Sequence, residues 1–213
     1  MFPELAADRA HGPLVPSVFH GDNADLIAAV APLYLTGSVL DVTYGRGRWW
    51  QRFQPEPFTF HDLNIDGVDF RRLPEADASI DAVTFDPPYV FTGGVGRRPD
   101  FQDRYGIGQA RVGGVGPQTT LILTGLVETC RVARQWILVK CMESGAGPAF
   151  IDLPHLITST ANQFGWIKHD QIVHYTGSGP GGHNIIEPRR ARRMHSYLLV
   201  FRPRSRRGQP QRP

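Results

Sequence analysis

The chain has 213 residues, of which 41% are hydrophobic and 20% are charged, and its formal net charge is +3. These values are typical of one globular domain with a sizeable core. No apolar run is long enough to cross a membrane, and the N-terminal residues lack the apolar segment of a secretory signal. We therefore predict a cytoplasmic protein without a membrane partner.

Two residue types that often carry chemistry are arranged without a functional pattern. Cys130 and Cys141 fall in predicted core elements and lack CxxC spacing, so both are expected to be buried apolar residues. The eight histidines show no HxH, HExxH or paired Cys/His spacing. No metal site is predicted.

Basic residues are concentrated near the C-terminus. All of them except Lys140 and Lys168 are arginines, and eight arginines fall between Arg189 and Arg207. Such a patch suits phosphate backbones, although it could also reflect genome base composition and a solvated tail. Lys140 follows a buried strand and either approaches the predicted pocket or, as is commoner, extends to solvent. The arginines predicted to contact nucleic acid are Arg189, Arg190, Arg192 and Arg193.

The chain is predicted to begin with a loosely ordered lead-in over residues 1–16, followed by a helix. Apolar residues at helical spacing predict that helix over 23–33, with Asn23 or Asp22 as its cap. The residues expected on its buried face are Leu26, Ile27, Val30 and Leu33.

A glycine turn connects the first two predicted strands. The strand over 38–43 contains Asp41 and runs into the turn 44–47. Asp62 stands at the carboxyl end of the next strand, over 57–61. Glycines let the backbone approach a ligand, and in nucleotide-binding βαβ units an acid about twenty residues later holds ribose hydroxyls. The absence of GK[ST] excludes a P-loop. Both acids could also be ordinary turn residues.

The most informative stretch follows a short third strand predicted at Val68–Phe70. Residues 81–85 read as a buried strand that ends in the sequence Asp86-Pro-Pro-Tyr89. Two consecutive prolines cannot continue the ladder, so the chain leaves the sheet in a stiff, extended exit. This exit holds a carboxylate, the Pro87 carbonyl and an aromatic ring above the strand ends, where ligands bind in open α/β sheets.

Such a cluster suits methylation of an exocyclic amino group on a base. The nitrogen lone pair of that group is delocalised into the ring, which makes it a poor nucleophile. Acceptors aimed at its two hydrogens favour a tetrahedral nitrogen, and Asp86 and the Pro87 carbonyl are candidates. Tyr89 could stack on the base. The alternative is an Asp-Pro pair that only begins a turn.

The remaining elements complete an alternating pattern. Residues 91–117 contain many glycines and no hydrophobic period, and we predict a mobile substrate lid there. Alternating strands and helices favour a mostly parallel sheet, and two closing strands without an intervening helix favour a C-terminal antiparallel hairpin. The other predicted segments are a helix over 119–136, a strand over 137–140, a helix over 150–164, a strand over 166–175, a basic recognition loop over 177–193, a strand over 196–201 and a disordered basic tail over 204–213.

The pattern Asp41-x-Thr-x-Gly45-x-Gly47, combined with Asp86-Pro-Pro-Tyr89, resembles the S-adenosylmethionine-dependent amino-methyltransferases, in particular the DNA adenine-N6 family. The resemblance implies one α/β domain over 17–203, Rossmann-like and doubly wound, with a seven-stranded sheet whose last strand is reversed. It departs from the family at the bulky Tyr44, where a small residue is usual. The implied cofactor-binding residues are Asp41, Gly45 and Gly47 at the methionine end, Asp62 at the ribose and Asp69 at the adenine, together with Thr43 and Leu63. The implied contacts to a flipped target base are Asp86, Pro87, Pro88 and Tyr89.

Three alternatives remain open on the sequence. The same pocket would serve an RNA base amino-methyltransferase, and cytosine N4 is a further acceptor, although serine is commoner there in place of Asp86. A catalytically silent nucleic-acid-binding module of this fold is the third. Because the chain has no separate recognition domain, specificity must come from the lid, the 177–193 loop and the tail, or from a partner, either a second copy or a recognition protein.

Overall fold

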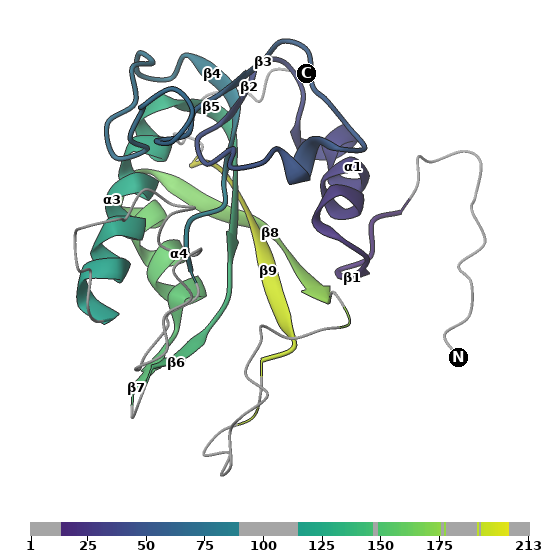
Figure 1. The fold of residues 1–213 in the computed structure, drawn as a ribbon, viewed down its shortest axis with the longest axis vertical. Helices are drawn as coiled ribbons and strands as arrows, with labels where there is room; N and C mark the ends of the chain where they lie inside the picture. Colours follow the sequence, from purple (N-terminus) through teal and green to yellow (C-terminus); the bar gives the residue numbers. More distant parts are fainter. Residues whose placement is uncertain are drawn as a thin grey trace.

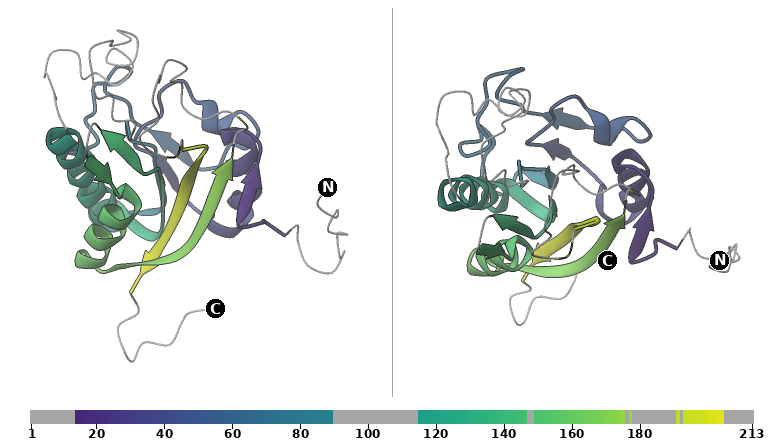
Figure 2. Two further views of the ribbon diagram at one scale, coloured as in Figure 1. Left: turned by 90° about the horizontal axis from the view of Figure 1, so that it is seen from below. Right: turned by 60° about the horizontal axis from the view of Figure 1, so that its bottom comes forward.

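The structure is a computed structural model that describes residues 14–89, 115–146, 149–175, 177, 191 and 193–204. One seven-stranded sheet runs through its centre, with helices on both faces (Figures 1 and 2). In spatial order its strands are β1 (Val18–His20), β8 (Trp166–Tyr175), β9 (His195–Pro203), β5 (Ala133–Cys141), β4 (Ile80–Phe85), β2 (Val39–Asp41) and β3 (Phe58–Phe60). The other elements are the helices α1 (Asn23–Tyr34), α3 (Val115–Val132) and α4 (Leu153–Gln163), the 3-10 turn η1 (Arg48–Trp50) and a separate hairpin of β6 (Ser144–Ala146) and β7 (Ala149–Ile151).

The strand directions confirm the predicted sheet. β3, β2, β4 and β5 are joined by parallel pairings, and β9 runs antiparallel to both β5 and β8. The edge strand β1 is parallel to β8. The fold is therefore a mostly parallel, Rossmann-like α/β sheet with a C-terminal antiparallel hairpin, as the alternating pattern indicates.

The sheet reverses its winding direction between β2 and β4. From β2 the chain moves outward to β3 and then returns to place β4 on the other side of β2. In open α/β sheets the crevice at such a switch point, beyond the carboxyl ends of the strands, is where ligands bind. Asp41 ends β2 and Asp86 follows β4, so the two carboxylates flank this point.

The predicted third strand at Val68–Phe70 is wrong, because Val68 and Asp69 have no regular structure and Phe70 begins a turn. The Asp66 carboxylate accepts a hydrogen bond from the Val68 amide at 3.1 Å, and the Asp69 carboxylate accepts one from the Arg71 amide at 2.9 Å. Such local side-chain bonds compete with pairing in a sheet. The seventh strand is instead β1, which lies at the opposite edge.

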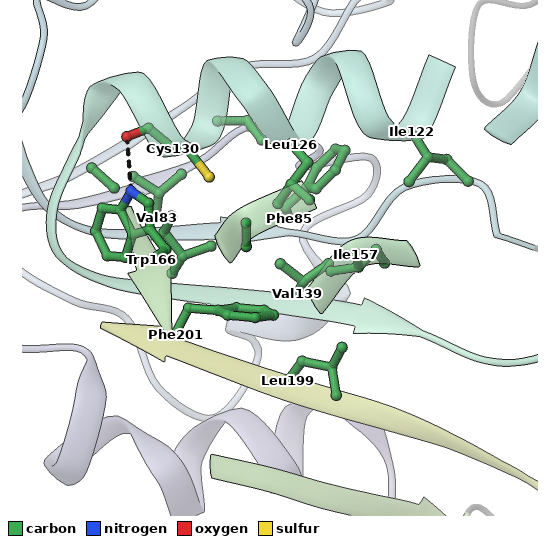
Figure 3. Close-up of a cluster of buried hydrophobic side chains, with 14 of the residues drawn as sticks. Val83, Phe85, Ile122, Leu126, Cys130, Val139, Ile157, Trp166, Leu199 and Phe201 are labelled. Carbon is green, nitrogen blue, oxygen red and sulfur yellow. Dashed lines mark hydrogen bonds between the residues drawn. The ribbon is translucent and has the colours of Figure 1, made fainter. Parts of the chain in front are cut away.

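Two hydrophobic cores cover the two faces of the sheet, and side chains alternate between them along each strand. On β4, Val83 and Phe85 pack towards α3 and α4, whereas Ala82 packs towards α1. Figure 3 shows the first of these cores, in which the Trp166 indole donates a hydrogen bond to the Cys130 carbonyl at 3.2 Å. The prediction that Cys130 and Cys141 are buried is confirmed.

Helix α1 begins at the predicted residue because its N-terminus has a complete capping box. The Asp22 carboxylate accepts from the Asp25 amide, and the Asp25 carboxylate accepts from the Asp22 amide. Its buried face differs from the prediction at one position, since Leu33 is 49% exposed and Tyr34 is buried in its place. Leu33 lies outside the arc defined by the other buried residues, because neighbouring residues of a helix are 100° apart.

Other element boundaries shift by a few residues. Helix α3 and strand β5 both begin four residues before their predicted starts at 119 and 137, and α4 begins at Leu153 because β7 occupies Ala149–Ile151. The predicted lid over 91–117 lies outside the described residues except for 115–117, which belong to α3. Most of the predicted lead-in, recognition loop and tail also lie outside them. None of the described helices combines the length and apolar character needed to cross a membrane.

Gly125 in α3 provides a test of this packing. A Cβ atom there would lie 2.4 Å from Phe70 Cδ2 and 2.9 Å from Phe85 Cζ, whereas a Cβ at Gly116 in the same helix would meet nothing within 4 Å. Helix propensity alone favours alanine by about 1 kcal/mol at either position. We expect Gly125→Ala to lower the free energy of unfolding by about 1–3 kcal/mol, as overpacked cores do. Gly116→Ala should not lower it, and denaturant unfolding of both variants measures the difference.

Candidate active site

The Asp86-Pro-Pro-Tyr89 segment leaves the sheet at the switch point. The Asp86 amide donates a hydrogen bond to the Thr43 hydroxyl at 2.7 Å, which joins this segment to the glycine turn after β2. The Tyr89 amide donates to the Pro87 carbonyl at 2.7 Å, and the Gln118 side chain donates to the Pro88 carbonyl. The segment is thus held in one conformation, with Tyr89 half-buried against the first core.

The Asp86 carboxylate is polarised by its surroundings. Burial raises its pKa to about 6, while the Lys140 ammonium and the Trp49 indole act in the opposite direction. The Trp49 indole nitrogen is itself buried, and it completes no hydrogen bond within the described part of the chain. Trp49 is the described donor that acts on the Asp86 carboxylate, since it lowers the pKa of that group. This carboxylate is therefore an ionisable acceptor with unused capacity.

Asp41 has a different environment from Asp86. It is 4% exposed, and its two oxygens accept hydrogen bonds from the Thr43 amide at 2.9 Å and the Trp50 indole at 2.7 Å. Burial raises its pKa to about 7, and these two donors act against that rise. Because its oxygens are already bonded, Asp41 orients Thr43 and Trp50, and through Thr43 it supports the Asp86 backbone.

The two glycines of the turn have different surroundings. Both have left-handed backbones, with φ of 59° at Gly45 and 65° at Gly47. A Cβ at Gly47 would lie 2.5 Å from the Tyr44 hydroxyl, whereas a Cβ at Gly45 would meet only the Thr43 carbonyl, at 3.8 Å. Gly47 is thus needed for packing within the protein, and Gly45 leaves its outer side open. The Tyr44 ring stacks on Phe60 with centroids 4.0 Å apart, so its bulk lies over β3.

The predicted ribose-binding acid lies beside this open glycine. The Asp62 carboxylate accepts hydrogen bonds from the Gly45 amide at 2.9 Å and from the Asn64 amide at 2.8 Å. Asp62 is half-buried and the neighbouring Leu63 is 42% exposed. A carboxylate, an apolar side chain and an exposed glycine backbone therefore meet at the carboxyl ends of β2 and β3.

Asp69, the predicted adenine contact, is engaged by a neighbour. Its carboxylate forms an ion pair with the Arg71 guanidinium, which lowers the pKa of Asp69. The segment between β3 and β4 is also held by His61, whose ring nitrogens lie 2.6 Å from an Asp66 oxygen and 2.7 Å from a Glu75 oxygen. Burial alone would lower the pKa of His61, but the two carboxylates raise it.

Lys140 does not extend to solvent, contrary to the commoner outcome expected for it. It is 1% exposed, and its ammonium contacts Asn23 of α1 and His174 of β8. The sequence analysis did not assign Asn23, His174, Trp49 or Trp50 to the site. Strand alternation was an available signal, because Lys140 must lie on the same face of β5 as the apolar residue Leu138.

Among the four predicted nucleic-acid contacts, Arg193 is the one inside the described residues. Its guanidinium nitrogen lies 3.8 Å from a Glu143 oxygen, and its guanidinium carbon lies 5.2 Å from the centre of the half-exposed Phe150 ring. Arg189, Arg190 and Arg192 lie outside the described residues. Within those residues, no group of three or more His, Cys, Asp or Glu side chains is arranged to hold a metal ion.

Comparison with known proteins finds only solved structures of low similarity. The sequence matches no protein-family model and no curated protein. A protein of Thermus thermophilus, provisionally described as a DNA modification methylase and solved with S-adenosyl-L-methionine, is 16% identical, with a TM-score of 0.40 over 67% of this chain and 54% of that chain. The 1,6-didemethyltoxoflavin-N1-methyltransferase of Burkholderia thailandensis, solved with S-adenosylhomocysteine, is 14% identical, with a TM-score of 0.45 over 86% of this chain and 79% of that chain.

A third protein with a related arrangement, the [4+2]-cyclase SpnF, is 13% identical, with a TM-score of 0.48 over 85% of this chain and 81% of that chain. The chain spans only about half the length of the Thermus protein. Likenesses at this level assign no activity to this chain, because one fold supports many chemistries.

Proposed function

We propose that this protein is an S-adenosylmethionine-dependent methyltransferase that acts on the exocyclic amino group of a nucleic-acid base, with adenine N6 in DNA as the first candidate. One observation carries the proposal. At the switch point of the sheet, the Asp86 carboxylate has unused acceptor capacity, and the rigid exit that holds it also presents the Pro87 carbonyl and Tyr89. A flipped base with an amino group requires hydrogen-bond acceptors for that group and an aromatic ring on which the base can stack.

The turn after β2 fits the proposed cofactor. The side of Gly45 that a Cβ would occupy is open, and Asp62 and Leu63 lie next to it. A half-buried carboxylate suits ribose hydroxyls, and an exposed leucine suits the flat face of an adenine. The Asp41 carboxylate holds Thr43 and Trp50, which flank the turn. Its proposed role is therefore to support the backbone that would contact the methionine end of the cofactor. When bound, the cofactor supplies an electrophilic methyl group on a sulfonium.

The reaction that we propose is a direct displacement. A bond forms between the amino nitrogen and the methyl carbon as the carbon–sulfur bond breaks, and the proton that the nitrogen loses passes to Asp86 or to water. Asp86 and the Pro87 carbonyl accept hydrogen bonds from the amine and so localise its lone pair, which stabilises the transition state more than the bound substrate. Asp86 performs this role when ionised, and its pKa of about 6 leaves it ionised at neutral pH.

The experiment that tests this function is methyl transfer from labelled cofactor to DNA and to RNA, followed by digestion and identification of the methylated nucleoside. N6-methyladenosine in the deoxy series is the expected product. Methylation of RNA alone would identify RNA as the substrate, and N4-methylcytosine would identify cytosine N4 as the acceptor. If no cofactor binding is detected by calorimetry, the protein is a nucleic-acid-binding module, and the catalytic proposal is wrong.

The predicted basic loop is tested by salt dependence. Each phosphate contact contributes about 0.9 units to the slope of log affinity against log salt. We expect replacement of Arg189, Arg190, Arg192 and Arg193 by alanine to weaken binding to every DNA sequence alike. The slope should flatten by up to about four units if all four arginines contact phosphates. Arg193 should contribute least, because Glu143 and Phe150 already contact it.

The matched control for this experiment is Arg134→Gln. Arg134 lies at the amino end of β5, where it pairs with Asp81. The substitution therefore removes a half-exposed cation from the end of the sheet opposite the site. The salt slope of this variant should equal that of the wild type. If the four-arginine variant also keeps the wild-type slope, these arginines form a solvated surface and nucleic acid approaches elsewhere.

A further inference from the structure

A row of polar side chains crosses the α1 face of the sheet at its carboxyl end. Phe85 of β4 is paired in register with Val139 of β5, and both pack on the opposite face. The residues that follow them on the two strands are Asp86 and Lys140. Both therefore point to the α1 face, from neighbouring positions. The interaction with Lys140 that lowers the pKa of Asp86 agrees with this placement. The ammonium and the carboxylate are adjacent members of the row.

Lys140 is held in place by two elements that are distant in sequence. Its Nζ donates to Asn23 Oδ1 of α1 at 2.5 Å and lies 2.9 Å from His174 Nδ1 of β8. The other ring nitrogen of His174 lies 3.0 Å from the Gly21 carbonyl, which can only accept. His174 Nε2 must therefore carry the proton, which leaves Nδ1 as the acceptor for the Lys140 ammonium.

In this network the lysine is charged and the neighbouring histidine is uncharged at neutral pH. Burial lowers the pKa of Lys140 to about 8, and the Asp86 carboxylate acts against this change. Burial and the nearby ammonium lower the pKa of His174 to about 4, so the ring is neutral at pH 7. Both described partners of the ammonium, Asn23 and His174, are neutral acceptors, and no described carboxylate forms an ion pair with it. Asp86 is the carboxylate that raises the pKa of this ammonium against the effect of burial.

The other groups around the pair do not replace this interaction. Asp41 of β2 also interacts with Asp86 but is itself an acid, so it supplies no positive charge, and its oxygens are bonded to Thr43 and Trp50. Trp49 of η1 faces Asp86 as a neutral indole. Around Lys140, Cys141 has a pKa above the physiological range because it is buried, so it is uncharged, and Leu198 of β9, paired with Lys140, is apolar.

We propose that Lys140 is a positioning residue for the methyl transfer, whose buried ammonium, fixed by Asn23 and His174, keeps Asp86 in the charged form that accepts hydrogen bonds from the target amine. The inference rests on the proposed function for its catalytic meaning. Its electrostatic content, the coupling of the two charges, can be measured without any substrate. Lys140 faces Asp86 rather than the reacting atoms, so it acts through Asp86.

The first test is the titration of Asp86 in the wild type and in Lys140→Met, followed through its carboxyl carbon by NMR and assigned with Asp86→Asn. Removal of a nearby opposite charge is expected to raise the Asp86 pKa by about one to three units. The acid limb of kcat/KM should move upwards by the same amount. Lys168→Met is the matched control, because it makes the same substitution at the other lysine of the chain, which is exposed on β8. It should leave the acid limb where it is in the wild type.

The second test needs no change at Lys140, and so it does not depend on whether Lys140→Met folds. The chain contains two lysines, so labelling with ¹⁵N-lysine gives one signal from Lys140 and one from the exposed Lys168, which Lys168→Arg assigns. Asp86→Asn should lower the pH at which Lys140 titrates by about one to three units and leave Lys168 unchanged.

The results separate the inference from the proposed function. An Asp86 titration unchanged in Lys140→Met, or a Lys140 titration unchanged in Asp86→Asn, contradicts the coupling and overturns the inference even if methyl transfer is observed. An acid limb that moves equally in Lys168→Met would mean that the shift does not come from the charge beside Asp86, and it would overturn the inference as well. A wild-type protein that methylates neither DNA nor RNA contradicts the proposed function, and that result comes from a separate assay.

Discussion

Asp86→Ala is expected to lower the rate of methyl transfer by about 10²–10³-fold or more, which is the effect of removing one preorganised group that stabilises a transition state. Cofactor affinity should stay within a few-fold of the wild type, because Asp86 is proposed to act on the target amine. Single-turnover assays with labelled cofactor, together with calorimetry, measure the two quantities. Retained turnover in this variant would rule out the proposed role of Asp86.

The free energy of unfolding of Asp86→Asn tests whether a loss of activity comes from unfolding. The folded-state pKa of Asp86 lies above its ordinary value of 3.8, so ionisation of this group opposes folding. The penalty is present above pH 6 and absent below pH 4. The asparagine variant should therefore gain more stability relative to the wild type at pH 7 than at pH 4. A stable but inactive protein is the expected combination, as is common at active sites.

Gly45→Val should abolish cofactor binding in a protein that remains folded. Among the described residues, the valine Cβ meets no atom closer than the Thr43 carbonyl at 3.8 Å, so its branched side chain projects into the space proposed for the ligand. The positive φ of 59° adds a strain of about 1–3 kcal/mol, because a β-branched residue rarely adopts this conformation. Calorimetric titration with S-adenosylmethionine measures the loss.

Gly165→Val is the matched control for that strain. Gly165 has φ of 84°, a Cβ there would meet nothing within 4 Å, and it lies before β8 at the amino end of the strand. Both variants should lose similar stability, but Gly165→Val should bind the cofactor normally. Equal affinity of the wild type and Gly45→Val would show that the turn after β2 is not the cofactor site. Gly47 is unsuitable for this comparison, since a side chain there collides with Tyr44.

Segments whose structure depends on local chemistry were predictable from the sequence. Helix α1 begins where its capping box requires, and strand β4 ends where two prolines remove the amide donors that a ladder needs. The position of Asp86 at the carboxyl end of a central strand also follows, because a buried apolar strand in an alternating α/β pattern lies inside the sheet. These properties depend on neighbouring residues, which one sequence displays completely.

Properties that depend on distant partners were decided only by the tertiary structure. Strand β1 has three residues, too few to show a period, and it exists because β8, more than 150 positions later, offers an edge at Val173 and its neighbours. The segment Val68–Phe70 has the composition of a strand, but the Asp66 carboxylate binds the Val68 amide and the Asp69 carboxylate binds the Arg71 amide that follows the segment.

The states of the charged side chains belong to the same class. Asp41 and Asp86 both stand at the ends of central strands in the sequence, yet one has its oxygens bonded to Thr43 and Trp50 and the other retains acceptor capacity. Lys140 could not be assigned because its partners, Asn23 and His174, approach it from elements that precede and follow it by many residues. A charge is buried only where donors and acceptors converge on it, and that convergence is a property of the folded chain.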